Sequence, residues 1–277
     1  MASSSCPMDS CFVSVVSPFY NRREWLSGCL ANLEQQTFRN FEVIVVDDGS
    51  TDNIAGAVTS AVTSFPLRCI RLDTNKGAGC ARNAGIDAAR GCYIAFLDSD
   101  DLWHKDKLQL QVEQFEAAGD RECLVGLSRQ TVLNDHPKFV RPRRLMNRCD
   151  RVGDFLFSSG GLIQSSSIFL TTALAKSARF DEAEPAHDDW TFALRLEAKG
   201  ARFEMLPQPL VYYRDDPRPD RRSHHQFRVS HAWLDRNRAA LGEKPYFAAL
   251  AAFASRASFG LAAAPLKTIV NAYWNGA

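Results

Sequence analysis

Four short apolar segments recur along the first hundred residues, and each has the length of a buried strand. They are rich in β-branched and aromatic residues, which favour strands over helices. The stretches between them follow the period of amphipathic helices. The pattern predicts strands at 11–17, 41–47, 67–72 and 92–98, and helices at 23–35, 53–64 and 80–89. Strands that alternate with helices indicate an α/β fold, with a mainly parallel sheet flanked by helices.

The second half of the chain shows the same two periods less regularly. It contains a predicted helix that begins with carboxylates and ends at Gly200, as helix termini prefer. The pattern in this half predicts helices at 105–119 and 187–200, and strands at 122–129, 201–207 and 209–214. We find no internal repeat in the chain.

A polar loop follows each of the first four predicted strands. The loops span residues 18–21, 47–52, 75–79 and 98–101, and they are rich in carboxylates and glycine. Right-handed crossovers bring the carboxyl ends of parallel strands to one edge of the sheet, where open α/β sheets bind ligands. We therefore expect a ligand site at this edge.

Two of these loops carry chemistry of their own. Residues i and i+2 of an extended segment point the same way, so Asp98 and Asp100 can share a hard divalent cation, Mg²⁺ or Mn²⁺. The alternative is a capped turn before the next helix. Asp47 and Asp48 can accept hydrogen bonds from a nucleobase or a ribose. Helix capping by the residues after them does not explain this pair.

The overall composition excludes some classes of protein. A net charge of +1, from 33 basic and 32 acidic residues, gives no field that implies nucleic-acid binding. The eight cysteines form no C-x-x-C pair, which disfavours a zinc site, and several are expected to be buried reduced thiols. Because the chain shows no secretory signal and no apolar stretch of ~20 residues, we expect a cytoplasmic protein.

Four segments, taken in order, resemble a known family. They are "VSVVSPFYNR", "QQTFRNFEVIVVDDGSTD", "NKGAGCARNAG" and "YIAFLDSDD". They are similar to the inverting GT-A glycosyltransferases of glycosyltransferase family 2, closely over residues 12–103 and more loosely to about 215. The resemblance implies a nucleotide-sugar-binding half at 12–104, an acceptor-binding half at 105–215 and a helical extension at 216–277.

The same resemblance implies an activity and a donor site. The enzyme would move a sugar from a nucleotide-diphospho-sugar, by default a UDP-sugar, to a saccharide or lipid-linked acceptor, with Mn²⁺ or Mg²⁺. It would take part in the synthesis of a surface polysaccharide or glycolipid. The implied donor contacts are Pro18 and Tyr20 beside the base, Asp48 reading the base with support from Asp47, Gly77, Arg82 and Asn83 near the diphosphate and sugar, and Asp98 and Asp100 at the metal.

The resemblance also implies a catalytic base at the start of the helix predicted at 187–200. The family has a Glu-Asp pair there, and this chain has Asp188 and Asp189. We predict Asp189 as the base and Asp188 as a substrate-binding residue; the alternative is that both only stabilise a helix N-terminus. Trp190 either stacks on a sugar or belongs to the core. Arg214 matches the "YR" that closes the catalytic region of the family.

Two other functions compete with this interpretation. A nucleotidyltransferase would need a glycine-rich basic loop after its first strand, and "SPFYNRR" has no glycine. A catalytically silent nucleotide-sugar-binding module would not need the intact Asp98, Asp100 and Asp189.

The apolar segment at 245–274 also has two interpretations. Its apolar residues are spaced as in two helices, separated at Pro265, that pack on the catalytic domain. Alternatively it makes a peripheral contact with the inner face of a membrane, for which Tyr273 and Trp274 suit the headgroup region.

Overall fold

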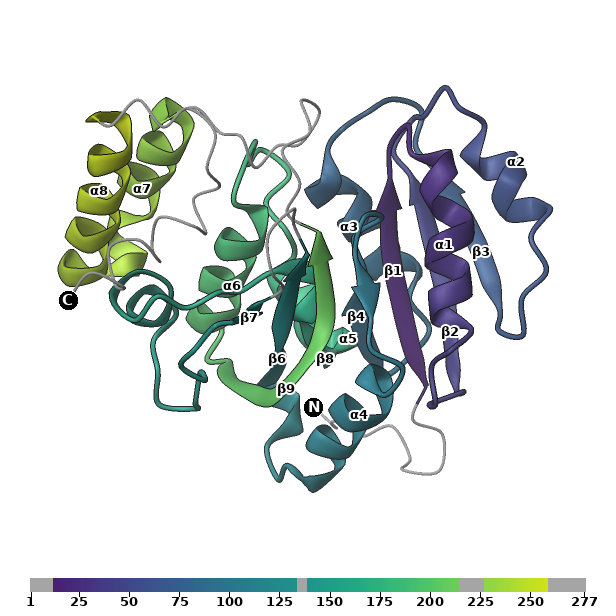
Figure 1. Cartoon of the computed structure of the whole chain (residues 1–277), viewed down its shortest axis with the longest axis horizontal. Coiled ribbons are helices and arrows are strands. Elements are labelled where there is room, and N and C mark those ends of the chain that lie inside the picture. The colour runs from purple at the N-terminus through teal and green to yellow at the C-terminus, as the bar shows by residue number, and fades with distance from the viewer. Residues whose placement is uncertain (1–11, 134–138, 215–226, 259–277) are drawn as a thin grey trace.

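The computed structural model describes residues 12–133, 139–214 and 227–258. Its centre is a nine-stranded sheet in the order β3-β2-β1-β4-β8-β6-β9-β5, and β7 pairs with β6 (Figure 1). Helices cover both faces of this sheet. The predicted fold class, a GT-A-like α/β sheet flanked by helices with a helical C-terminal part, is confirmed.

The N-terminal half matches the predicted alternation closely. Its four strands pair in parallel, with β1 between β2 and β4 and with β3 outside β2. The elements are β1 (Val13–Phe19), α1 (Arg23–Leu33), β2 (Phe41–Asp47), α2 (Ile54–Thr59), β3 (Leu67–Arg71), α3 (Ala78–Ala88) and β4 (Tyr93–Phe96). Parallel pairing places the polar loops after β1, β2, β3 and β4 at one edge, as expected.

The second half continues the sheet with mixed pairing. Strand β8 runs antiparallel to both β4 and β6, whereas β9 runs parallel to β6. The elements are β5 (Leu102–Trp103), α4 (Lys107–Ala117), β6 (Leu124–Leu133), β7 (Phe139–Arg141), β8 (Phe169–Thr171), α5 (Thr172–Ala178), α6 (Asp188–Ala198) and β9 (Arg202–Arg214). The sequence pattern did not predict β5, β7, β8 or α5, which are all short.

The prediction of two strands at 201–207 and 209–214 is wrong, because β9 is one continuous strand. Its register against β6 shifts between Ser128 and Gln130, where the ladder steps from Leu206 to Pro209 and then to Val211. A proline has no N–H to donate to the ladder, so the strand passes the proline-rich stretch as a bulge instead of ending there.

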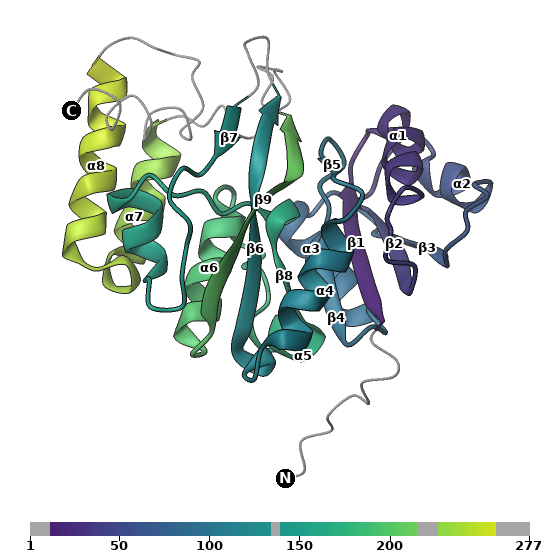
Figure 2. The ribbon, with the colours of Figure 1, turned by 60° about the horizontal axis from the view of Figure 1, so that its bottom comes forward.

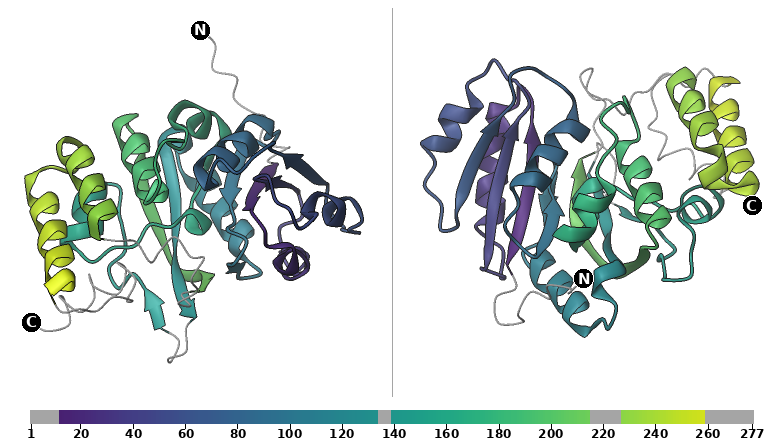
Figure 3. Two further views of the ribbon diagram at one scale, coloured as in Figure 1. Left: turned by 90° about the horizontal axis from the view of Figure 1, so that it is seen from above. Right: turned by 180° about the vertical axis from the view of Figure 1, so that it is seen from behind.

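Strands β1, β2 and β4 are mostly buried because helices cover both of their faces, whereas the edge strand β3 is only half-buried. Helices α1, α2 and α4 pack on one face and α3, α5 and α6 on the other. Figure 3, right, shows the green helices of the second layer in front of the strands. At Gly85 in α3 an added Cβ would lie 2.3 Å from Val16 Cγ1, so only glycine permits this close packing of helix on strand.

Two helices, α7 (Phe227–Leu241) and α8 (Glu243–Ser258), form an antiparallel pair beside α6 (Figures 1 and 2). Trp233, Leu234, Tyr246 and Phe253 are buried in the same core cluster as α6. This packing favours the structural interpretation for the part of the 245–274 segment that is described. Pro265, Tyr273 and Trp274 lie outside the described residues.

Neither the membrane contact nor the cellular location is tested by this packing. Within the described ranges, no helix combines the length and the apolar character needed to cross a bilayer.

The cysteine prediction holds in part. Cys29 is buried and burial raises its pKa to about 12, whereas Cys123 and Cys149 are exposed.

Candidate active site

The loop after β2 is built on two buried carboxylates. Asp47 accepts hydrogen bonds from Ser50 N and from Arg71 Nη1, both at 2.8 Å. Asp48 accepts from the backbone N–H groups of Lys76 and Gly77, also at 2.8 Å. The two carboxylates therefore tie the loops after β2 and β3 together. Sequence reasoning missed Arg71, although its place at the end of β3 was a usable signal.

The other predicted base-binding residues lie at the rim of the same edge. Pro18 is half-buried at the end of β1, and the ring of Tyr20 is 43% exposed, so it can receive a planar ligand. The backbone oxygen of Phe19 between them accepts from Asp48 N at 2.9 Å. Gly77 has a φ of 96°, in the region that favours glycine, and it brings two backbone N–H groups onto Asp48.

Arg82 connects the N-terminal half of the chain to the second half. Its guanidinium donates to Asp98 Oδ1 and to Asp188 Oδ2, each at 2.5 Å, although Asp188 is 106 positions away in sequence. The side chain of Arg82 is only 5% exposed. Burial alone would lower the pKa of Arg82, but the charges of Asp98 and Asp188 outweigh it and raise that pKa. The guanidinium is therefore a permanent buried cation between two carboxylates.

Replacing Arg82 with Met is expected to destabilise the fold, because Asp98 and Asp188 would lose their shared counter-ion. Fully buried pairs broken in this way cost about 3–5 kcal/mol; we expect roughly 2 kcal/mol here, since both carboxylates keep access to water. Urea denaturation measures the loss. The matched control is Arg179→Met, which breaks an exposed pair with Asp87 and should cost less than about 1 kcal/mol. Equal losses would contradict the proposed burial cost.

Asn83 serves the architecture of this junction. Its side-chain nitrogen donates to Phe180 O at 3.0 Å and to Glu182 Oε1 at 2.8 Å, and its side-chain oxygen accepts from Phe180 N at 2.9 Å. The residue is 1% exposed. The amide of Asn83 is therefore already bonded to the loop of Phe180 and Glu182, and its predicted proximity to the donor diphosphate and sugar stays a prediction.

The three carboxylates after β4 have different surroundings. Asp98 pairs with Arg82, and Asp100 Oδ2 lies 3.1 Å from Arg22 Nη1. Asp101 is 1% exposed and accepts from Gln164, from Ser166 Oγ at 2.7 Å and from Arg214 N at 3.2 Å. Burial, together with the charges of Asp100 and Asp98, raises the pKa of Asp101 to about 7. Asp101 therefore supports the loop from beneath, a role that sequence reasoning missed.

Asp98 and Asp100 fit a sparsely held divalent cation. Their side chains are 23% and 11% exposed. Over the described ranges, no group of three or more His, Cys, Asp or Glu side chains lies together as a complete metal site. Two carboxylates at an edge suit Mg²⁺ or Mn²⁺, which keep several positions for substrate oxygens and water. Asp98 and Asp100 would therefore supply only part of a coordination shell, and diphosphate oxygens and water would have to supply the rest.

The aspartate pair predicted to include the catalytic base, Asp188 and Asp189, begins helix α6. Both oxygens of Asp188 are engaged, Oδ2 by Arg82 and Oδ1 by Asp189 N at 3.1 Å. Asp189 Oδ1 accepts from Trp190 N at 2.9 Å, and the residue is half-buried. Carboxylates in this first turn also interact favourably with the helix dipole. The structure thus brings Asp188 and Asp189 to the carboxylates after β4, with Asp188 as the bridge.

The neighbouring predicted residues lie differently. Trp190 is 5% exposed and packs edge-on against Phe157 and Trp233, which favours the core interpretation over sugar stacking. Arg214 binds Asp101 through its backbone, and its guanidinium lies 4.6 Å from the centre of the Trp25 ring. Arg214 therefore adjoins the site, and its role in substrate binding stays a prediction.

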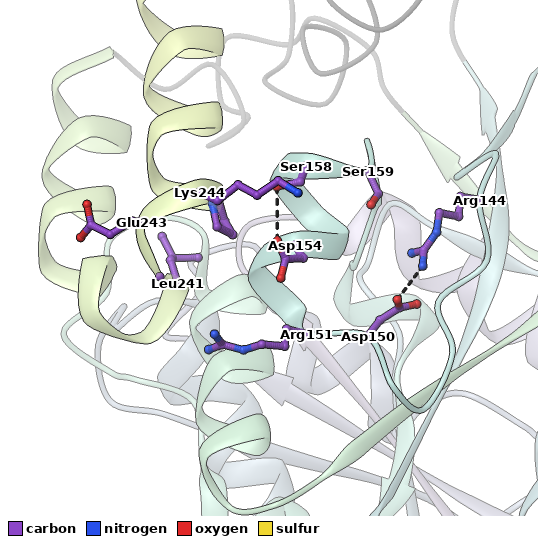
Figure 4. Close-up of a pocket in the computed structure, with 11 residues that line it drawn as sticks. Arg144, Asp150, Arg151, Asp154, Ser158, Ser159, Leu241, Glu243 and Lys244 are labelled. Atoms are coloured by element: carbon purple, nitrogen blue, oxygen red, sulfur yellow. Dashed lines mark hydrogen bonds and ion pairs between the residues drawn. The ribbon is translucent and has the colours of Figure 1, made fainter.

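A separate hollow of about 510 Å³ lies between α8 and residues 150–159 (Figure 4). Arg144 and Arg151 are among the residues that line it. Arg144 forms an ion pair with Asp150 at 2.5 Å, and Arg151 lies 3.8 Å from Glu197. Glu197 is in the last turn of α6, roughly 14 Å along the helix axis from Asp188. The hollow is therefore at the opposite end of α6 from the carboxylates.

Comparisons with known proteins show the family to which the chain belongs. The family model "Glycosyl transferase family 2" matches residues 14–156. The amylovoran biosynthesis glycosyltransferase AmsB of Erwinia amylovora is 37% identical over 207 residues, which cover 72% of this chain and 68% of AmsB. The chain belongs to glycosyltransferase family 2, and it is a glycosyltransferase.

Two solved structures share the fold. S. aureus TarS 1–349 in complex with UDP-GlcNAc aligns with a TM-score of 0.64 and 22% identity, covering 81% of this chain and 66% of that one. The mannosyltransferase PcManGT of Pyrobaculum calidifontis, in complex with GDP-Man and Mn²⁺, aligns with a TM-score of 0.59 and 20% identity. That alignment covers 90% of this chain and 81% of PcManGT. At these identities the likeness concerns the fold alone.

Proposed function

We propose that this glycosyltransferase moves a sugar with inversion from a nucleotide-diphospho-sugar, in the first instance a UDP-sugar, to a saccharide or lipid-linked acceptor. One observation carries the proposal: a single guanidinium, that of Arg82, binds both Asp98 of the donor half and Asp188 of the base pair. The donor carboxylates and the start of α6 therefore border one site, as a direct displacement requires.

The residues divide the work as follows. Tyr20 stacks on the base at the rim, while Asp48 reads it and holds the loop of Gly77. Asp189 takes the proton of the acceptor hydroxyl as its oxygen attacks the anomeric carbon, and the bond from that carbon to the diphosphate breaks. Inversion needs only this one base. Asp98 and Asp100 would hold Mn²⁺ or Mg²⁺, which neutralises charge on the departing diphosphate.

The relatives support the broader role. AmsB is named for the synthesis of a polysaccharide, and TarS and PcManGT were solved with nucleotide sugars. We propose by analogy that this chain acts in polysaccharide or cell-envelope synthesis in the cytoplasm, at the inner face of the membrane.

Donor-dependent thermal stabilisation tests the donor. A ligand that binds only the folded state raises the melting temperature. We expect the largest rise with a UDP-sugar and Mn²⁺, compared with GDP- and dTDP-sugars, and release of nucleoside diphosphate once an acceptor is added. Offering the acceptor as a free saccharide or as a lipid-linked saccharide in liposomes separates the two acceptor classes. No stabilisation and no release with any donor would refute the proposal.

A further inference from the structure

The start of helix α6 is held from two opposite sides. Arg82 holds it from the donor half, through Asp188. From the other side, α7 reaches it by two hydrogen bonds, each from a buried residue of α7. Ser230 Oγ lies 3.0 Å from His187 Nε2, and Trp233 Nε1 donates to Thr191 Oγ1 at 2.8 Å. Ser230 and Trp233 are both 0% exposed. Helix α7 is thus bonded to the residue immediately before the aspartate pair and to the second residue after it.

The backbone conformation of His187 explains why these contacts matter for the two aspartates that follow it. His187 is the N-cap of α6 and has a φ of 58°. This is a left-handed backbone conformation, which is uncommon for residues other than glycine. A residue keeps such a backbone conformation only where contacts with the surrounding structure hold it in place. The imidazole is stacked on Trp190 at 4.4 Å and 7°, and it meets Trp233 edge-on at 5.6 Å. These contacts fix the direction in which the chain enters Asp188 and Asp189.

We propose that α7 is part of the catalytic apparatus and that His187 and Ser230 are positioning residues for the base. The inference rests on the proposed role of Asp189 as that base. Asp189 is two positions after His187, so a rotation of the His187 backbone moves its carboxylate directly. A misplacement of about 1 Å can lower a rate by about 10²-fold. The hydrogen bond between the His187 imidazole and Ser230, a buried residue of a separate helix, opposes this rotation.

The first test removes one hydroxyl group. Ser230→Ala is expected to lower kcat for sugar transfer by roughly 10-fold or more, with the KM for the donor and the donor-dependent thermal shift unchanged. Tyr246→Phe is the matched control. It removes a hydroxyl that bonds Asp235 at 2.8 Å within the same helix pair, without touching α6, and should leave kcat unchanged. Equal kcat values for the two variants would overturn the inference.

A double-variant cycle separates positioning from general stability. If Ser230 acts through Asp189, adding Ser230→Ala to Asp189→Asn should lower kcat no further, because the carboxylate being positioned is already gone. A multiplicative loss in the double variant would overturn the inference. Should Ser230→Ala fail to fold, His187→Asn tests the same junction, since asparagine tolerates a left-handed backbone but lacks the imidazole that contacts Ser230 and stacks on Trp190.

The two proposals fail in distinguishable ways. Normal turnover in Asp189→Asn would refute the base assignment itself. A large loss in Asp189→Asn, combined with an unaffected or independent Ser230→Ala, would refute only the positioning role of α7.

Discussion

Asp189→Asn is expected to lower kcat for sugar transfer by about 10²- to 10⁴-fold, the usual contribution of a general base. Asparagine has the same shape and keeps an oxygen for the Trp190 N–H, but it cannot take the proton of the acceptor hydroxyl. Donor affinity should be nearly unchanged, because the hydrogen bond that ties the start of α6 to Arg82 is made by the neighbouring Asp188, which is kept, and the substituted side chain can still accept from Trp190 N. Release of nucleoside diphosphate measures kcat, and calorimetry measures donor binding.

The control for this experiment is Asp106→Asn. Asp106 also stands at the start of a helix, α4, but it bonds Thr37 and Lys105, away from the edge that carries the aspartates. Its substitution should leave both quantities unchanged. If Asp189→Asn instead loses donor affinity and turns over bound donor at a normal rate, Asp189 belongs to the donor site and the base lies elsewhere.

Asp100→Ala is expected to abolish metal-dependent transfer and to weaken donor binding. The substitution removes one of the two carboxylates available to the cation and leaves Arg22 with Ser99 Oγ, at 3.2 Å, as a partner. The cation would then hold the diphosphate with a single protein ligand. Titration of Mn²⁺ against transfer rate, and donor binding with and without a chelator, measure the two effects.

Asp87→Ala provides the comparison, since Asp87 is an exposed aspartate paired with Arg179 and lies outside the site. It should show the metal dependence of the unmodified protein. Normal turnover with an unchanged Mn²⁺ requirement in Asp100→Ala would show that the Asp98-Ser99-Asp100 element serves only to shape the loop.

Sequence reasoning succeeded where a single stretch of chain carries its own signal. The strand at 41–47 was predicted at its observed bounds, Phe41–Asp47, because a run that is apolar on both faces belongs in the middle of a sheet. The grouping of Asp48, Gly77 and Asp98 followed from the rule that parallel strands end at one edge. Each of these predictions needs only local pattern and chain direction.

The failures share a different cause. Strand β9 was divided in two because its prolines look like a break, while the ten paired positions of β6 keep it continuous past a bulge. No sequence pattern near α7 indicated that this helix would form a hydrogen bond with His187. The burial of Trp190 depends on Phe157 and Trp233, which come from two other elements. A side chain's surroundings are set by packing, and packing is not periodic in sequence.

The sequence by itself therefore determined the α/β alternation, the polar edge and the identity of the aspartates that lie there. Only the tertiary structure decided how these aspartates are divided. Asp101 became a buried support, Asp188 became a bridge to Arg82, and Asp189 was placed next to Asp188 in the first turn of α6. The physical reason is that hydrogen-bond partners and exclusion of water assign the roles of chemically identical carboxylates, and both come from segments distant in the chain.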